Sequence, residues 1–335
     1  MSALGNEPRG AAMRFTRDEL DAAVAIVRRH VPPTPQYSWP MLDAVAGSHV
    51  IVKHENHTPV GAFKVRGGLV YMDRLVRERP GVTGVVSATR GNHGQSLAFA
   101  GRHYRRAVTI FVPHGNSVEK NAAMRALGAE VVEFGTDFQE ARERSLEFAA
   151  ERGLEPVPPF HRDLVLGVAT YALELFEGAE HLDAVYVPVG MGSGLNALIS
   201  VRDLLGLDTQ LVGVVSDRAP STLLSFERGA VVTTESASTF VDGVATRSPD
   251  PTAIDGIIAG AARIVAVSDD ATAEAMRIIY RTTHNVAESA GAIALAGLLS
   301  EPHEQRGRRS AFVLCGGNVD TAQLHAVLGG ATPTA

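Results

Sequence analysis

Cysteine and tryptophan are almost missing from this chain of 335 residues, which contains one of each. The single cysteine, Cys315, excludes a framework of intrachain disulfides. A net charge of −6 and a pI near 6.1 provide no basic surface of the kind that nucleic acid or an anionic membrane requires. Long apolar runs are missing too, because glycine or charge interrupts each one well before the length of a bilayer span. A small anionic substrate remains compatible with this composition, since it needs only a local positive site.

The N-terminal stretch MSALGNEPRGAAMRF contains no apolar core of the kind found in a secretory signal. We therefore expect a cytoplasmic protein with neither a membrane partner nor a nucleic-acid partner. With 45% hydrophobic residues and 6% aromatic ones, the chain can bury one large core or two moderate cores.

Apolar runs typical of strands alternate with helical periodicity along most of the chain. Thr16 and Glu19 form a capping box before the helical DELDAAVAIVRRH, and HVIVKHE then indicates a buried strand. Further strands, most of them followed by helical segments, are predicted at GVVSAT, VTIFVP, EVVEF, LDAVYVPVG, QLVGVVS, RIVAVS and SAFVLCGGN. Residues 219–262 show no regular pattern. The alternation predicts parallel sheets with helices on both faces, in two α/β lobes that meet near the proline-rich EPVPPF.

Residues 61–68, GAFKVRGG, place Lys64 among small and apolar neighbours instead of the polar ones usual for a surface lysine. Such neighbours can desolvate the amine, and a desolvated lysine is a candidate nucleophile.

Three other segments end a predicted strand in glycines: SATRGNHGQS, PVGMGSGLNA and LCGGN. Glycines let a ligand approach the main chain, and main-chain N–H groups at a helix N-terminus bind anions. In PVGMGSGLNA the spacing of Gly190, Gly192 and Gly194 with Ser193 suits a phosphate cradle, although it lacks the full nucleotide-binding motifs. Each segment alone also fits a plainer role, such as a tight connection, a solvated lysine or a small buried cysteine. Together, a reactive lysine and an anion cradle are what an aldehyde-bearing phosphorylated cofactor requires.

The order GAFKVRGG, RGNHGQ, GMGSG, ESAGA and CGGN resembles the serine/threonine dehydratase family of pyridoxal-phosphate enzymes, which have the tryptophan synthase β-like fold (fold type II). The resemblance runs from about residue 16 to about residue 325 and includes EKNAAMRALGAEVV and TFVDGVA. It implies an α/β fold of two lobes, each an open, mostly parallel sheet flanked by helices. Residues 1–83 and 157–335 would form the large cofactor-binding domain, and residues 84–156 a small, mobile domain that closes over substrate. A homodimer is also expected.

The resemblance gives roles to particular residues. Lys64 would hold pyridoxal 5'-phosphate through an imine and later move the proton on the substrate's Cα. Phe63 would lie against the pyridine ring, Asn92 would bond its phenolic oxygen, and Cys315 would face its nitrogen. The phosphate would lie on Gly190, Met191, Gly192, Ser193 and Gly194, and the substrate carboxylate on Thr89, Arg90, Gly91, Asn92 and His93.

The activity that the resemblance implies is a carbon–nitrogen lyase reaction, in which an L-β-hydroxy amino acid of the threonine or serine type gives a 2-oxo acid and ammonia. A larger or acidic substrate, such as phenylserine or hydroxyaspartate, is the alternative. Racemisation and β-replacement use the same scaffold, and a cofactor-storing protein without turnover is a further reading.

The chain departs from the family pattern at several positions. Arg90 stands where the racemases place a serine that acts as the second base, and a guanidinium cannot take that role, so little racemase activity is expected. Arg90 could instead pair with a substrate carboxylate or form a structural salt bridge. Ala62 replaces the serine usual before Phe-Lys. Acidic metal ligands of some relatives align with Val215 and Ser221, so no metal is expected. The chain ends soon after CGGN, without room for a regulatory domain, which favours a catabolic role.

Overall fold

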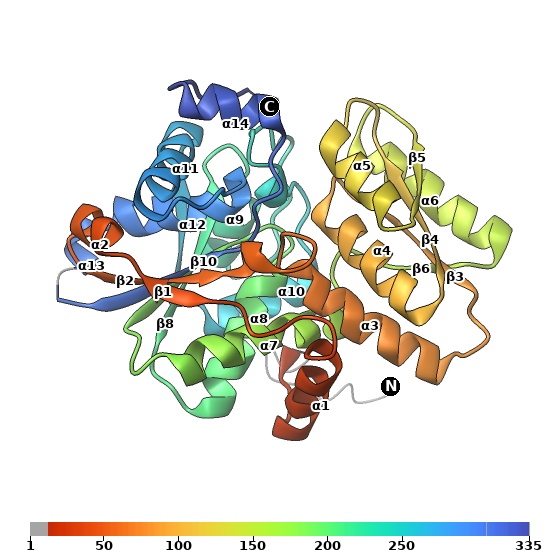
Figure 1. Ribbon diagram of the computed structural model, residues 1–335, viewed down its shortest axis with the longest axis horizontal. Helices are drawn as coiled ribbons and strands as arrows, with labels where there is room; N and C mark the ends of the chain where they lie inside the picture. Colours follow the sequence, from red (N-terminus) through yellow and green to blue (C-terminus); the bar gives the residue numbers. More distant parts are fainter. Residues whose placement is uncertain (1–12, 306, 335) are drawn as a thin grey trace.

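Two α/β lobes lie side by side in the computed structural model, which describes residues 13–305 and 307–334 (Figure 1). We call the part around the six-stranded sheet the large lobe and the part around the four-stranded sheet the small lobe. Residues 1–12, and with them most of the N-terminal stretch considered above, lie outside the described residues.

The sheet of the large lobe has the strand order β1-β2-β10-β7-β8-β9. All neighbouring strands are parallel except β1 and β2, which are antiparallel. Its inner strands are buried apolar runs, as expected for strands covered by helices on both faces. The strands are β1 (Gln36–Ser38), β2 (His49–His54), β7 (Ala184–Pro188), β8 (Gln210–Ser216), β9 (Arg263–Val267) and β10 (Arg309–Leu314).

The helices of the large lobe cover the two faces of this sheet, and α12 contacts strands β7, β8, β9 and β10. They are α1 (Arg17–Val27), α2 (Pro40–Ala46), α3 (Lys64–Glu78), α7 (Arg162–Gly178), α8 (Ser193–Leu205), α9 (Ser221–Arg228), α10 (Pro251–Gly260), α11 (Asp269–Thr283), α12 (Ser289–Ser300), α13 (Pro302–Gln305) and α14 (Thr321–Leu328). Two short 3-10 turns are η2 (Glu55–His57) and η3 (Asp242–Val244).

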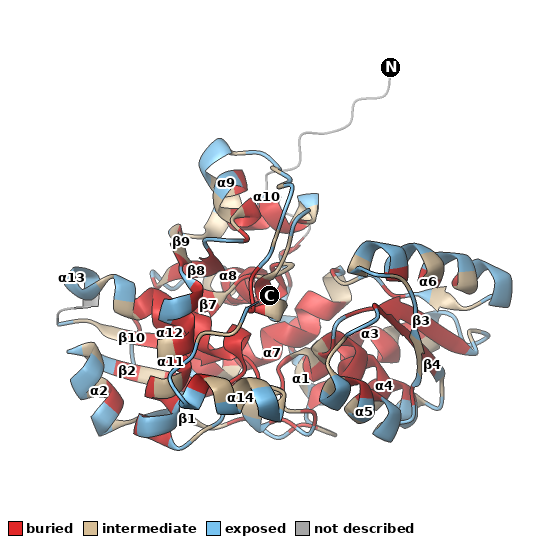
Figure 2. Cartoon of the chain, turned by 90° about the horizontal axis from the view of Figure 1, so that it is seen from above, coloured by how far each residue is buried: buried red, intermediate tan, exposed pale blue. Residues whose placement is uncertain are grey.

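The small lobe has the strand order β5-β4-β3-β6, with every neighbouring pair parallel. Its strands are β3 (Gly84–Ala88), β4 (Ala107–Val112), β5 (Glu130–Glu133) and β6 (Glu155–Pro156), and its helices are α4 (Asn92–Tyr104), α5 (Val118–Ala126) and α6 (Phe138–Arg152). Helix α3 packs against both α4 and α7 and so joins the two lobes. The outer face of α6 is exposed, while the strands beneath it are buried (Figure 2).

The predicted fold class, two mostly parallel sheets flanked by helices, is confirmed. The capping box of Thr16 and Glu19 is present at the start of α1. One local expectation was incomplete: residues 219–262, which show no regular pattern in the sequence, contain helices α9 and α10. Lys64 is the first residue of α3. None of the helices in the described part of the chain combines the length and apolar character needed to cross a bilayer.

A buried cluster of four charges fixes the start of α3. The Arg66 side chain is fully buried and lies 2.8 Å from Glu55 and 2.9 Å from Glu174. Lys53, also fully buried, lies 2.8 Å from Glu174. Two cations therefore balance two carboxylates, and the cluster ties β2, η2, α3 and α7 together two residues after Lys64.

Replacing Arg66 with methionine is expected to lower the free energy of unfolding by about 3–5 kcal/mol, because Lys53 would be the one fully buried cation left in this cluster for two buried carboxylates. The half-exposed Arg28, 3.8 Å from Glu174, compensates little. Urea unfolding measures this change. Arg17→Met is the matched control, since Arg17 pairs with Asp21 at 2.9 Å but both side chains are about half exposed. The control should differ little from the natural protein, and equal losses in the two variants would contradict the expectation.

Candidate active site

The segment before Lys64 pairs with the segment that follows strand β10. The Phe63 N–H donates to the Cys315 carbonyl at 3.0 Å, and the Gly317 N–H donates to the Gly61 carbonyl at 2.9 Å. Between these two bonds, Ala62 and Gly316 form an isolated antiparallel bridge. GAFKVRGG and CGGN, about 250 residues apart in the sequence, are thus held against each other by the main chain.

The amine of Lys64 lies 4.5 Å from the centre of the Phe63 ring. Among the described residues it has no hydrogen bond and no ion pair. Burial lowers the pKa of Lys64 below its ordinary value, and this effect is only partly opposed by the Cys315 and Glu288 side chains. A larger fraction of this amine is therefore neutral and nucleophilic than in a surface lysine.

The turn that follows β3 brings the start of α4 to the same place. The first main-chain bond of α4 runs from the Gln95 N–H to the Gly91 carbonyl at 3.0 Å, so the N–H groups before Gln95 are left at the helix end. His93 is buried and its Nε2 has no partner. Burial, with a smaller effect of the Lys64 charge, lowers the pKa of His93 to about 3. A neutral imidazole and an anion-binding helix end therefore lie close to Lys64.

Two residues of the same turn make further contacts. The Gly91 N–H donates to the Thr89 hydroxyl at 3.1 Å, so this amide already has a partner. The guanidinium of Arg90 lies 3.5 Å from the Asp242 carboxylate of η3, and both side chains remain partly exposed, by 48% and 39%. Arg90 and Asp242 therefore form an ion pair between the lobes that water can reach.

The glycine turn after β7 forms the third part of the site. Gly192 has a φ of +90°. The first main-chain hydrogen bond of α8 is donated by the Asn196 N–H to the Gly192 carbonyl, so the N–H groups of residues 193–195 have no partner within the helix. A Cβ at Gly190 would lie 2.2 Å from the Gly243 carbonyl oxygen, so no side chain fits there. The main-chain donors at this turn are of the kind that binds phosphate.

Tyr171, Ala290 and Gly243 connect this cradle to the lysine. The Tyr171 ring meets the Phe63 ring edge to face, with centroids 6.1 Å apart, and its hydroxyl donates to the Gly194 carbonyl at 3.4 Å. On the other side, the Cys315 thiol donates to the Ala290 carbonyl at 3.4 Å, and Ala290 lies beside Gly243. Burial raises the pKa of the Cys315 thiol, which is therefore neutral. The predicted site residues of all four segments are thus brought together.

Several site residues were not assigned from the sequence. Glu288 accepts a hydrogen bond from the Asn92 amide at 2.5 Å and pairs with Lys120 at 3.3 Å. The Asn318 side-chain amide donates to Oδ1 of the Asn92 side chain at 2.9 Å. Glu288, Asn318 and Lys120 lie within the motifs ESAGA, CGGN and EKNAAMRALGAEVV, so membership in a motif was the signal that could have found them.

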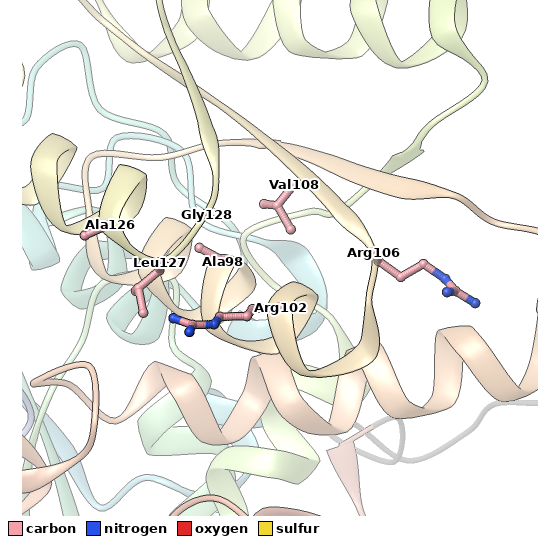
Figure 3. A pocket seen from close by; sticks show the side chains of 7 residues that line it. All are labelled: Ala98, Arg102, Arg106, Val108, Ala126, Leu127 and Gly128. Atoms are coloured by element: carbon pink, nitrogen blue, oxygen red, sulfur yellow. The ribbon is translucent and has the colours of Figure 1, made fainter.

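A hollow of about 410 Å³ on the small lobe lies apart from these residues. It is lined by Ala98, Arg102, Arg106, Val108, Ala126, Leu127 and Gly128, none of which belongs to the predicted site. Figure 3 shows the guanidinium groups of Arg102 and Arg106 pointing away from each other, so they do not converge on one ligand.

The part of the chain that the structure describes contains no group of three or more His, Cys, Asp or Glu side chains that could hold a metal ion.

The arrangement fits an aldehyde cofactor that carries a phosphate. Lys64 offers an unpaired amine, the α8 end offers phosphate donors, and the buried His93 Nε2 shows that a polar surface of the site lacks a partner within the protein. Such a site within two mostly parallel α/β lobes defines the pyridoxal-phosphate enzymes of fold type II.

Comparisons with known proteins agree. The family described as "Pyridoxal-phosphate dependent enzyme" matches residues 27–316. The L-threonine ammonia-lyase of Thermotoga maritima is 30% identical over 319 residues, which cover 94% of this chain and 78% of that protein. An L-threo-3-hydroxyaspartate ammonia-lyase of a Pseudomonas species is 31% identical over 298 residues, covering 89% and 93%. The solved structure of the processed form of threonine deaminase isoform 2 from Solanum lycopersicum superimposes with a TM-score of 0.86 at 28% identity, covering 95% and 96%.

The chain belongs to the pyridoxal-phosphate-dependent enzyme family. Its cofactor is pyridoxal 5'-phosphate and its class is that of the carbon–nitrogen lyases, as the sequence predicted. The roles of the individual site residues and the two domain ranges stay predictions.

We expect Lys64→Ala to abolish covalent attachment of pyridoxal phosphate, because the described site offers no other unpaired amine. Borohydride trapping followed by peptide mass analysis measures this attachment.

In the natural protein, half of the Lys64 amine should react with pyridoxal phosphate at a pH below 10.5, the ordinary pKa of lysine. A free lysine derivative is the control, and a midpoint equal to that of the control would contradict the desolvated state of Lys64.

The buried His93 should make the free energy of unfolding depend on pH. Its pKa is about 3 in the folded protein, below the ordinary 6.5, so the unfolded chain takes up a proton first as the pH falls. Stability is then lost between pH 6.5 and 3, with a slope of up to about 1.4 kcal/mol per pH unit from this residue. His93→Gln should show a shallower loss when urea unfolding is measured across this window. Parallel curves for the two proteins would rule the effect out.

Proposed function

We propose that this enzyme converts an L-β-hydroxy amino acid of the threonine or serine type to a 2-oxo acid and ammonia. The observation that carries the proposal is the unpaired, desolvated amine of Lys64 close to His93 at the start of α4. The relatives named above act on threonine and on 3-hydroxyaspartate, which are both β-hydroxy amino acids.

Within this proposal, Lys64 has two tasks. Its neutral amine attaches the cofactor, and the same amine, once released, removes the proton from the substrate's Cα. Bound pyridoxal phosphate supplies a conjugated ring that accepts the electron pair left when this bond breaks. The lowered pKa of Lys64 suits both tasks, because each begins with an amine that lacks a proton.

The two helix ends hold the opposite ends of the reacting molecules. The start of α8, with Ser193 and the glycines before it, would bind the phosphate, and the start of α4 would bind the substrate carboxylate. Asn92 would bond the phenolic oxygen of the ring, and Phe63 would cover one face of the ring. Held at both ends, the substrate would keep one orientation toward Lys64, which favours removal of the proton from its Cα.

We propose that Arg90 makes racemisation slow. A racemase needs a second base on the opposite side of the substrate, and an arginine guanidinium cannot serve as that base. Its guanidinium lies 3.5 Å from the Asp242 carboxylate across the seam between the lobes.

A second candidate substrate is a β-hydroxy amino acid with an extra carboxylate, such as hydroxyaspartate. The Arg90–Asp242 pair favours it, because an ion pair at 3.5 Å with both side chains partly exposed is weak and can exchange for a substrate carboxylate. The 31% identity to a 3-hydroxyaspartate ammonia-lyase supports the same candidate.

The small domain of residues 84–156 would move to admit substrate, and the protein would act as a cytoplasmic homodimer in a catabolic role. These features stay proposals. Size measurement by light scattering would test the dimer.

A panel of β-hydroxy amino acids is expected to yield 2-oxo acid and ammonia in equal amounts, with little D-amino acid product. Serine, threonine, phenylserine and 3-hydroxyaspartate make up the panel, and chiral chromatography with an ammonia assay measures the products. Clear interconversion of L-serine and D-serine would contradict the role given to Arg90. Formation of thioether product from added thiols would instead indicate a β-replacement enzyme.

Arg90→Ala distinguishes the two substrate candidates. If the side chain of the substrate carries a carboxylate, kcat/KM for hydroxyaspartate should fall by about tenfold or more, while kcat/KM for threonine changes little. Equal losses for both substrates would assign Arg90 to the α-carboxylate that they share, and no loss for either would restrict it to the ion pair between the lobes.

A further inference from the structure

Glu288 is a buried carboxylate at the centre of the site. It is 4% exposed, precedes the first residue of α12, and its main-chain N–H donates to the Gly316 carbonyl at 3.1 Å. A Cβ at Gly316 would lie 2.1 Å from Glu288 Oε1, so a glycine at this position leaves room for the carboxylate. The large lobe therefore provides a fitted place for one negative charge beside strand β10.

Both oxygens of this carboxylate meet groups of the small lobe. Oε1 accepts from the Asn92 amide at 2.5 Å, and Oε2 lies 3.3 Å from the Lys120 ammonium. Asn92 begins α4 and Lys120 lies in α5, so one carboxylate holds two helices of the other lobe. The opposite end of the Asn92 side chain accepts from Asn318 at 2.9 Å, which leaves one N–H of Asn92 unassigned.

Lys120 fits this place as closely as Glu288 does. Its side chain is 12% exposed, and a Cβ at Gly91 would lie 2.5 Å from its Cδ. Burial acts to lower the pKa of Lys120, but the carboxylates of Glu288, Asp242 and Asp320 together outweigh burial and the net shift is upward, so the ammonium is charged. A buried carboxylate without this ammonium would lack compensation close to Lys64.

We propose that Glu288, with Lys120 as its counter-ion, is a positioning residue that orients Asn92 toward the cofactor ring and joins the small lobe to the large lobe around it. The inference rests on the proposed role of Asn92. With Glu288 and Asn318 holding two of its bonds, the Asn92 amide can present its remaining N–H in only a narrow range of directions. Because Lys120 cancels the charge of Glu288, the pair fixes geometry without adding net charge beside Lys64.

Few other charged groups face this pair. Lys64 is faced by Glu288, by the Cys315 thiol from the end of β10 and by the His93 imidazole of α4. Besides Glu288, the carboxylates of Asp242 and Asp320 act on Lys120. Removing one member of the pair therefore changes the net charge near Lys64 by one unit, in a known direction.

Four variants test the proposal on the cofactor-loaded protein: Glu288→Gln, Lys120→Met, their combination, and Asn92→Ala. The first readout is the dissociation constant of pyridoxal phosphate, and the second is the pH midpoint of the bound cofactor's visible absorption. Each single change at the ion pair should weaken cofactor binding by about tenfold or more, because one buried charge loses its partner. The combined variant should return to within about threefold of the natural protein, since glutamine still accepts from Asn92 and no charge is left unpaired.

The pH midpoint of the cofactor's absorption should shift in opposite directions in the two single variants. Lys120→Met leaves an uncompensated negative charge and should move the midpoint up, whereas Glu288→Gln leaves a positive charge and should move it down. The combined variant should match the natural protein. If the Glu288–Lys120 pair only stabilised the fold, the absorption midpoints of the two single variants would not shift in opposite directions.

Arg125→Met is the matched control. Arg125 lies in the same helix as Lys120 and pairs with Glu133 at the same distance, 3.3 Å, but both side chains are about half exposed. It should leave binding and absorption unchanged.

Three results would overturn the proposal: losses that multiply in the combined variant, midpoints that move in the same direction, or a control that behaves like Lys120→Met. A further result would overturn the positioning part of the proposal: unchanged cofactor absorption in Asn92→Ala, together with rescue in the combined variant. Asn92 would then have no role at the cofactor, and the Glu288–Lys120 pair would only join the lobes. Loss of ammonia release with intact cofactor binding throughout would contradict the proposed activity alone.

Discussion

The desolvation of one amine is the constraint on which the rest of this structure depends. An amine without a counter-ion is unfavourable in a buried place, and the fold tolerates it because the surroundings of Lys64 are fixed from two sides. Main-chain bonds to residues 315–317 hold the segment before it. The buried cluster around Arg66 holds the helix that follows it. Both sides of the main chain at Lys64 are therefore held in place.

Charge is distributed around the site according to the same constraint. Near the reacting amine the groups are neutral: a thiol at Cys315 and an imidazole at His93, both kept uncharged by burial. The charged groups occur in matched pairs, with Glu288 and Lys120 beside these neutral groups and Arg90 and Asp242 at the more exposed seam between the lobes. Both of these pairs take their cation from the small lobe and their anion from the large lobe. The seam between the lobes is therefore held partly by attraction that depends on how closely the lobes approach.

Much of the fold could be predicted because its periodic patterns are strong. Buried strands such as β8 are continuous apolar runs, and the alternation of strand and helix identified two parallel sheets correctly. Lys64 at the start of α3 was harder to place, since glycines and an apolar neighbour obscure the start of a helix that has no side-chain cap. The helices within residues 219–262 were missed for a related reason: α9 and α10 are short and surrounded by irregular segments.

The sequence by itself determined the chemistry that is present, because a reactive lysine, glycine-lined strand ends and a phosphate cradle each leave a local mark in residue type and spacing. Only the tertiary structure decided which charges meet. Glu288 lies 168 positions after Lys120, and nothing local to either residue indicates the other, since their 3.3 Å contact arises from the packing of two lobes. For the same reason the partner of Arg90, left open between substrate and protein, became visible only when Asp242 was found beside it.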